Sequence, residues 1–208
     1  MTGTEVILLS ASWIIYFVIH SWLANESFKQ SVIQRFNLDL QKYRLFYVTI
    51  VTVLLLPPLW FTFYPDSGLL WKWDGALLWL MNSIAAVGIA GFIVSMKYYD
   101  GMAFLGLKPF ATKNAEQPFT LSPLHRFVRH PWYFLSLLVI WTRDMTIAWF
   151  ITCLLITLYF IIGSKLEEQK LILYFGDVYQ QYKKKVPGLF PLPWRFLKKE
   201  EADFLINQ

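Results

Sequence analysis

Long apolar runs separated by short polar segments dominate the pattern of hydrophobic and polar positions. A membrane-spanning helix needs about 20 mostly apolar residues. Four runs come close to that length, and they lie at Val6–Ala24, Tyr43–Tyr64, Ala76–Met96 and Met145–Gly163. A fifth run, Pro131–Trp141, is too short alone and reaches spanning length only if it begins near Leu124 and includes charged residues. The pattern predicts an all-α integral membrane protein with five transmembrane helices.

The last two predicted helices are joined by only a short polar link, Thr142–Asp144, which predicts a helical hairpin. An amphipathic C-terminal segment rich in aromatic residues follows the hairpin. We expect this segment to lie on the cytosolic membrane surface and to cover any site there. Its apolar and aromatic positions include Leu171, Tyr174, Phe175, Tyr179 and Tyr182.

The composition supports a membrane protein. Hydrophobic residues make up 56% of the chain and charged residues 16%, well below the roughly 25% typical of soluble domains. The net charge of +5 is also consistent with binding to nucleic acid, but the positions of the basic residues provide a simpler explanation. Cys153 is the sole cysteine of the sequence, so an intramolecular disulfide is excluded.

The basic residues are distributed unevenly across the predicted membrane. Seventeen of the nineteen lysines and arginines fall in the loop after the first helix, in and after the loop that follows the third, or in the C-terminal tail. The other two are Lys72 and Arg143. Cytosolic loops carry the excess of basic residues in membrane proteins. We therefore predict a multi-pass protein with its N-terminus outside and its C-terminus in the cytosol, without a nucleic-acid partner.

Charged residues stand at the start of the fourth predicted helix. If Trp141 lies at the outer interface, a rise of 1.5 Å per residue puts His130 about 16 Å inward, near mid-bilayer. A charge at that depth costs about 2.5–3.5 kcal/mol or more and usually lines a protein cavity or meets a counter-charge. Pro131 suits the first turn of a helix, where unpaired N–H groups attract anions. Arg129, His130 and this helix start therefore predict an anion-binding corner.

Snorkelling to lipid phosphate is the alternative for these side chains. We expect it for Arg126, whereas both interpretations stay open for Arg129 and His130. Lys183–Lys185, farther along the chain, have the composition of a patch that binds anionic lipid.

An acidic pair provides a counter-charge to the basic corner. Glu167 and Glu168 directly follow the last apolar run, and a hairpin places them on the same side as Arg129 and His130. A ligand with both a carboxylate and an ammonium would suit such a pocket, and S-adenosylmethionine is one. Its carboxylate would bind the basic corner, its ammonium either glutamate, and its adenine and sulfonium the faces of aromatic rings. Another zwitterionic or nucleotide ligand stays open on this reasoning alone.

The segments "RFVRHPWY" and "LEEQKLILYFGDVYQQYKKKVPGLFP" resemble the isoprenylcysteine carboxyl methyltransferase and phospholipid methyltransferase superfamily. "DMTIAWFITCLLITLYFIIGSKLEE" is similar to the branch that methylates small thiols. The resemblance covers Leu121 to Pro193 and departs from the family pattern at Pro123, His125 and Leu135. The residues that match the combined motif are Arg129, His130, Pro131, Tyr133, Glu167, Glu168, Phe175, Gly176, Tyr179, Tyr182, Val186 and Pro187.

The resemblance implies a cytosol-facing S-adenosylmethionine pocket with a lipid-side entrance for an apolar or small methyl acceptor. It implies no metal, and it assigns Arg129 and His130 a catalytic as well as a binding role. The single membrane domain of residues 1–208 would then comprise three helices and their loops (1–120), a cofactor-binding cassette (121–193) and a polar tail (194–208). The expected cofactor-binding residues are His125, Arg129, His130, Pro131, Tyr133, Glu167, Glu168, Tyr179 and Tyr182.

Methyl transfer is an in-line displacement at a sulfonium carbon. A thiolate or carboxylate acceptor needs no dedicated general base, so catalysis would come mainly from proximity and desolvation. An alcohol or amine acceptor would need a base, and His125 is the nearest candidate. The residues do not distinguish among a prenylated cysteine, a small thiol and a lipid headgroup as acceptor.

Two other functions fit parts of the same sequence. Membrane sterol reductases resemble this C-terminal half but bind NADPH, whose phosphates would suit Arg129 and the lysines. A non-enzymatic membrane protein, such as a lipid-binding or transport accessory, would use the charges structurally. The oligomeric state is left open.

Overall fold

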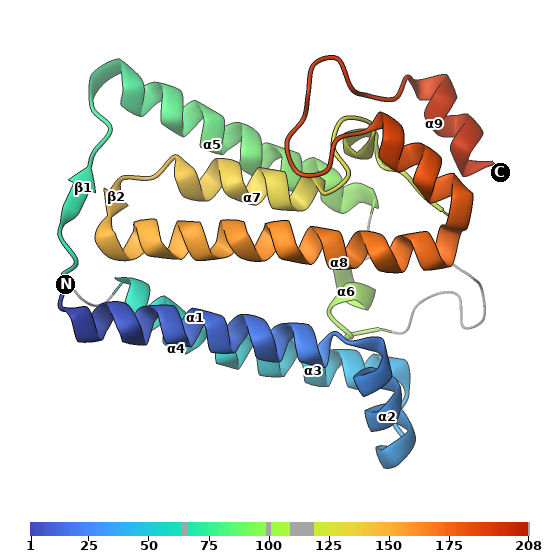
Figure 1. Ribbon diagram of the computed structural model, residues 1–208, viewed down its shortest axis with the longest axis horizontal. Helices are drawn as coiled ribbons and strands as arrows, with labels where there is room; N and C mark the ends of the chain where they lie inside the picture. Colours follow the sequence, from blue (N-terminus) through green and yellow to red (C-terminus); the bar gives the residue numbers. More distant parts are fainter. Residues whose placement is uncertain (64–65, 99–100, 109–118, 208) are drawn as a thin grey trace. The chain divides into compact units, whose positions relative to one another are not determined.

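The computed structural model describes residues 1–63, 66–98, 101–108 and 119–207, and it is mostly helical (Figure 1). The helices are α1 (Gly3–Leu23), α2 (Glu26–Phe36), α3 (Leu40–Leu54), α4 (Leu56–Phe63), α5 (Gly75–Ser95), α6 (Gly101–Phe104), α7 (Pro131–Trp141), α8 (Ile147–Lys185) and α9 (Lys199–Ile206). The 3-10 turns η1 (Met96–Tyr98) and η2 (Pro123–Arg126) and the strands β1 (Leu69–Trp71) and β2 (Met145–Thr146) complete the described elements.

Four helices of the described chain are long and apolar enough to cross a membrane. They match the four long runs of the sequence and make this a multi-pass membrane protein. Tyr64, the predicted end of the second run, and Lys113, one of the basic residues counted above, lie outside the described residues. The fifth run forms α7, an apolar helix of 11 residues, which is about 16 Å long. The four segments are Gly3–Leu23, Leu40–Phe63, Gly75–Tyr98 and Ile147–Lys185.

The chain divides into two compact units. The first contains residues 1–72, 99–113 and 144–156, and the second contains residues 73–98, 114–143 and 157–208. Helix α8 therefore contributes its N-terminal part to the first unit and the rest to the second.

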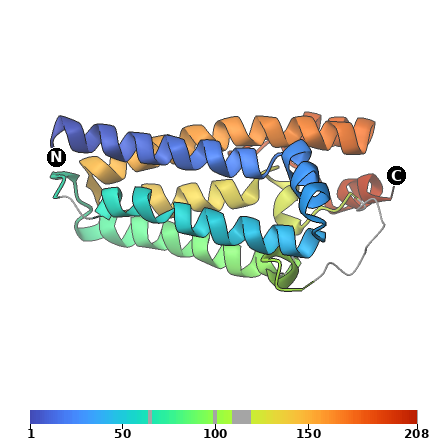
Figure 2. The ribbon, with the colours of Figure 1, turned by 90° about the horizontal axis from the view of Figure 1, so that it is seen from below.

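In the first unit, α1 lies alongside α4 (Figures 1 and 2). The helix is interrupted at Leu55, between α3 and α4, two residues before Pro57 and Pro58. Proline lacks the N–H that continues a helix, which explains the break. Strands β1 and β2 form a short antiparallel pair, with Leu69 opposite Thr146 and Trp71 opposite Met145.

A neutral polar cluster lies buried in the first unit. The indole N–H of Trp13 on α1 donates to the hydroxyls of Thr152 at 3.1 Å and Thr62 at 3.4 Å. The two hydroxyls are 2.9 Å apart, and that of Thr62 donates to the Pro58 carbonyl at 2.7 Å. These three side chains connect α1, α4 and α8. Each has its hydrogen-bonding groups satisfied by protein atoms.

In the second unit, α5 packs closely on α7. A Cβ at Gly91 would lie 2.6 Å from the Leu135 side chain, and one at Gly88 would lie 3.0 Å from Val139, so glycine permits this approach. The indole of Trp132 on α7 donates to the Ser95 hydroxyl at 2.8 Å. These contacts hold α7 on α5 along its length, directly after the charged residues Arg129 and His130.

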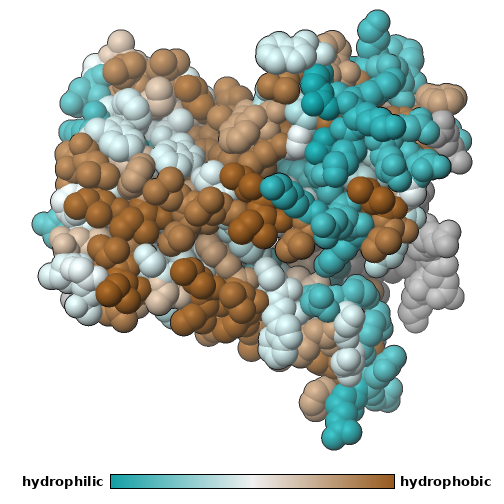
Figure 3. All heavy atoms as spheres, viewed as in Figure 1, coloured by the Kyte–Doolittle hydropathy of each residue, from teal (hydrophilic) through white to brown (hydrophobic). Residues whose placement is uncertain are grey.

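Hydrophobic and hydrophilic side chains occupy different parts of the surface along α8. Hydrophobic side chains cover α5 and the middle of α8, whereas hydrophilic side chains gather over α9 and the C-terminal end of α8 (Figure 3). Large apolar side chains are widely exposed, for example Trp79 at 75% on α5, as expected for helices that face lipid.

Candidate active site

A sharp turn in α8 builds the candidate site. Gly176 has φ 53° and ψ −128°, a combination that residues with a side chain rarely adopt. The helix changes direction there (Figure 1), which divides its distal part into a long limb that ends at Phe175 and a short limb, residues 177–185. The short limb folds back, so that Lys183 reaches Glu168 on the long limb.

Glu168 is the centre of the site. Its side chain is buried, and its Oε1 accepts from Arg129 Nε at 2.8 Å and Nη2 at 2.6 Å. The same oxygen lies 3.2 Å from His130 Nε2, while Oε2 lies 2.9 Å from Lys183 Nζ. Three nitrogen-bearing side chains therefore surround one buried carboxylate, which offsets the cost of removing its charge from water.

Arg129 is fixed by backbone as well as by side-chain contacts. Its Nη1 donates to the Lys183 carbonyl at 3.0 Å and to the Val186 carbonyl. Its backbone N–H donates to Pro187 O at 2.9 Å, and the N–H of His130 donates to Gly188 O at 3.1 Å. The chain after α8 therefore runs directly against the charged turn before α7.

Glu167 occupies a more open position than its neighbour. Its side chain is 49% exposed, and its Oε2 lies 3.3 Å from His130 Nδ1 and accepts from the Tyr133 hydroxyl at 3.3 Å. His130 thus bridges the two glutamates through its two ring nitrogens. The Tyr133 ring stacks between His130, at a centroid distance of 5.4 Å, and Phe160, at 4.5 Å.

Contacts at both ends of α7 align it with α8 in antiparallel register. His130 meets Glu168 at one end, and the Trp141 indole donates to Thr157 at 3.0 Å at the other. Eleven residues separate the contact points on each helix. His130 therefore lies beside the polar residues that follow the apolar run of α8.

His125 lies beside the charged turn but outside the ion-pair cluster. Its Nδ1 is 2.7 Å from the Ser122 hydroxyl, and its carbonyl accepts from the Tyr182 hydroxyl at 2.7 Å.

The two predicted tyrosines of the C-terminal segment lie in a hydrophobic cluster. Tyr179 and Tyr182 are 2% exposed, and their rings pack against each other and against Phe119. Arg126, for which we expected snorkelling, forms two hydrogen bonds with Leu197. The Nε of Arg126 donates to the Leu197 carbonyl at 3.0 Å, and the N–H of Leu197 donates to the Arg126 carbonyl at 2.9 Å.

The structure therefore brings together Arg129, His130, Tyr133, Glu167 and Glu168. Pro131 begins α7 next to them. Arg129 and Glu168, which we had assigned to opposite ends of one ligand, also pair directly with each other.

Sequence reasoning missed Lys183, because the run Lys183–Lys185 has the composition of a lipid-binding patch. It also missed the carbonyls of residues 186–188. The available signal was Gly176, an interruption that folds the helix back.

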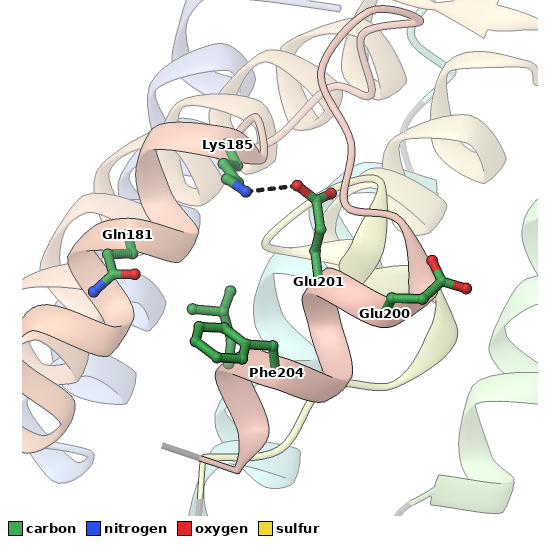
Figure 4. Close-up of a pocket in the computed structure, with 6 residues that line it drawn as sticks. Gln181, Lys185, Glu200, Glu201 and Phe204 are labelled. Carbon is green, nitrogen blue, oxygen red and sulfur yellow. Dashed lines mark hydrogen bonds and ion pairs between the residues drawn. The ribbon is translucent and has the colours of Figure 1, made fainter.

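A cavity of about 290 Å³ lies elsewhere in the second unit, between the end of α8 and α9 (Figure 4). Lys185 and Glu201 form an ion pair of 2.6 Å on its wall. None of the predicted cofactor-binding residues belongs to its lining, which comprises Gln181, Lys185, Glu200, Glu201, Phe204 and Leu205.

The chain is similar to methanethiol S-methyltransferases over most of its length. It is 30% identical over 194 residues to methanethiol S-methyltransferase 2 of Bradyrhizobium diazoefficiens, covering 90% of this chain and 74% of that enzyme. It is 31% identical over 188 residues to methanethiol S-methyltransferase of Pseudomonas deceptionensis, covering 85% and 69%. The enzyme of the same name from Crocosphaera subtropica is 26% identical over 184 residues, covering 85% and 71%. No protein-family model and no solved structure matches the chain.

These relatives carry out methyl transfer rather than reduction, and their similarity extends beyond the motif into the first three apolar helices. The long apolar helices add that the enzyme is a multi-pass membrane protein. The chain belongs to the methanethiol S-methyltransferase family, within the isoprenylcysteine carboxyl methyltransferase-like superfamily, and is a membrane methyltransferase.

Proposed function

We propose that this enzyme transfers the methyl group of S-adenosylmethionine to a small thiol such as methanethiol. The observation that carries the proposal is the cluster of Arg129, His130, Glu167 and Glu168 in a chain of this family. The cluster offers cationic and anionic groups side by side, as a zwitterionic cofactor requires. The small-thiol acceptor is taken from the names of the relatives.

The two glutamates would have different roles in holding the cofactor. Glu168 is buried and already accepts from Arg129 and Lys183, so it has little capacity for another donor. Glu167 is half-exposed and keeps acceptor capacity, so we assign the cofactor ammonium to Glu167. Arg129 and His130 would hold the cofactor carboxylate and orient an anionic acceptor.

The remaining predicted residues would complete the cofactor site. The stacked ring of Tyr133 provides an aromatic face, and Pro131 occupies the first position of α7 beside that ring. His125 would serve as a polar contact, and Tyr179 and Tyr182 as the aromatic cover.

The acceptor sulfur would react as a thiolate. When bound, S-adenosylmethionine would supply the methyl group from its sulfonium centre: a bond would form between the thiolate sulfur and the methyl carbon, and the electron pair of the broken carbon–sulfonium bond would remain on the departing sulfur. The thiol proton would pass to water before this step, so no dedicated base is needed. The contribution of the protein is to orient the two reactants and to exclude water.

We also propose five spans, with the N-terminus outside, the C-terminus cytosolic and contacts of the tail with membrane lipid. The excess of basic residues on one side supports this orientation. The fifth span would be α7 together with the preceding residues from about 124, joined to α8 as a hairpin. Single cysteines placed at positions 3 and 207 in a Cys153→Ser background test it: an impermeant thiol reagent should label only position 3 from outside intact cells. The reverse labelling would overturn the orientation.

The function is tested by methyl transfer in lipid nanodiscs. Purified enzyme, S-adenosylmethionine with a labelled methyl group and methanethiol should yield labelled dimethyl sulfide. A prenylated cysteine and a lipid headgroup serve as competing acceptors. Glu167→Gln should weaken binding of S-adenosylhomocysteine about tenfold, because it removes the charge that faces the ammonium. Transfer to a competing acceptor alone would contradict the small-thiol assignment, and no binding of S-adenosylhomocysteine would contradict the cofactor.

A further inference from the structure

Lys183 contacts the charged cluster in two ways. Its Nζ lies 2.9 Å from Oε2 of Glu168, the oxygen that Arg129 and His130 leave free. Its carbonyl accepts from Arg129 Nη1 at 3.0 Å. The side chain is 42% exposed, so it covers the cluster at the protein surface.

The contact depends on the fold of α8. Fifteen positions separate Lys183 from Glu168, which is about 22 Å along a straight helix. That distance exceeds the combined reach of the two side chains, so they meet because the short limb folds back at Gly176. The ion pair therefore joins the two limbs of α8, and it does so at the carboxylate that orients Arg129 and His130.

The two neighbouring lysines have other contacts. Lys185 pairs with Glu201 on α9 at 2.6 Å. The side chain of Lys184 is exposed, and its carbonyl accepts from Arg195 at 2.7 Å. The run of three lysines thus contains one residue that faces the site, one that faces α9 and one that faces outward.

We propose that Lys183 is a positioning residue for methyl transfer. It holds the short limb on Glu168 and thereby fixes the carboxylate around which Arg129 and His130 are oriented. This assignment rests on the proposed function, because the oriented groups are those assigned to the cofactor. Loss of the ammonium would remove one contact of the short limb and leave one oxygen of Glu168 without its partner, while Arg129 and His130 would keep the other oxygen.

Hydrogen exchange of the full-length protein in nanodiscs, without cofactor, tests whether the ion pair of Lys183 and Glu168 holds the short limb. Lys183→Met should speed amide exchange in residues 177–188 about fivefold, as expected for the loss of one partly exposed ion pair. Lys183→Arg should restore slow exchange, and Lys184→Met is the matched control that should leave it unchanged. Equal exchange rates in Lys183→Met and Lys184→Met would show that the Lys183 ion pair does not hold the short limb.

Cofactor binding tests the positioning role. Lys183→Met should weaken binding of S-adenosylhomocysteine and raise KM for S-adenosylmethionine about fivefold, with a smaller change in kcat, and Lys183→Arg should recover both. Faster exchange with unchanged affinity and KM would overturn the positioning role. If the wild-type protein bound no S-adenosylhomocysteine, the proposed function would fail and the role of Lys183 with it, whereas the exchange experiment would still decide whether the ion pair holds the limb.

Discussion

Buried polar side chains have different kinds of partners in the two units. In the first, Trp13, Thr62 and Thr152 form a neutral cluster whose donors and acceptors match one another. In the second, Arg129 and Glu168 form a charged cluster that also uses backbone carbonyls. The neutral cluster connects three apolar helices, whereas the charged cluster stands where α7 begins and the apolar run of α8 ends.

The difference follows from the cost of desolvation. A neutral hydroxyl or indole needs one or two partners, which neighbouring helices supply. A buried carboxylate needs several donors, and their own charges need partners in turn. The charged cluster therefore also includes the Lys183 side chain and the backbone carbonyls of residues 186–188, which lie beyond the apolar run of α8. Removing a member of each cluster should have unequal consequences.

Removal of the central carboxylate should have the largest effect. Glu168→Ala leaves Arg129, His130 and Lys183 without their shared partner, so the free energy of unfolding should fall by about 3–5 kcal/mol. Glu167→Ala is the matched control, and its half-exposed side chain should cost about 1 kcal/mol or less. Unfolding in a detergent titration measures both. Equal losses would show that the two glutamates are not distinguished by burial.

The turn that completes the charged cluster should come next. Gly176→Ala forces a side chain into the left-handed region and should cost about 1–3 kcal/mol. The cost would be backbone strain alone, because a Cβ there meets no atom within 4 Å. Gly163→Ala in the long limb is the control, and it should be neutral or stabilising, since the nearest atom to its Cβ would be the Tyr133 hydroxyl at 3.9 Å. A neutral Gly176→Ala would contradict the strained turn.

The neutral cluster should give the smallest effect. Thr152→Val keeps the shape but leaves the Trp13 indole with only its 3.4 Å bond to Thr62, and it should cost about 1 kcal/mol. Thr52→Val is the matched control, because the Thr52 hydroxyl is exposed and bonds within its own helix to Val48 O. Unfolding measurements in the same detergent compare the two. A loss as large as that of Glu168→Ala would remove the distinction between the clusters.

The long helices could be predicted closely from sequence. The first predicted span, Val6–Ala24, is α1 at Gly3–Leu23, and the third, Ala76–Met96, is α5 at Gly75–Ser95. The additional N-terminal residues of α1 belong to a capping box of Thr2 and Glu5, a local signal that hydropathy does not register. The number of five spans and the orientation stay predictions.

The site was predictable in part. The basic turn and the two glutamates were identified because charges beside apolar runs require partners. Which glutamate is buried could not be read from two adjacent identical residues, because only the packing of α7 and the short limb distinguishes them. The role of Lys183 was equally hidden among three consecutive lysines.

The sequence alone determined where apolar helices form and which charged residues adjoin them, because both depend on local composition and on the cost of burying charge. Tertiary structure decided which charges meet. That choice depends on the register of α7 against α8 and on one positive-φ glycine that turns the helix back. Ion pairing falls off within a few ångströms, so it is settled by the folded path of the chain and not by proximity in sequence.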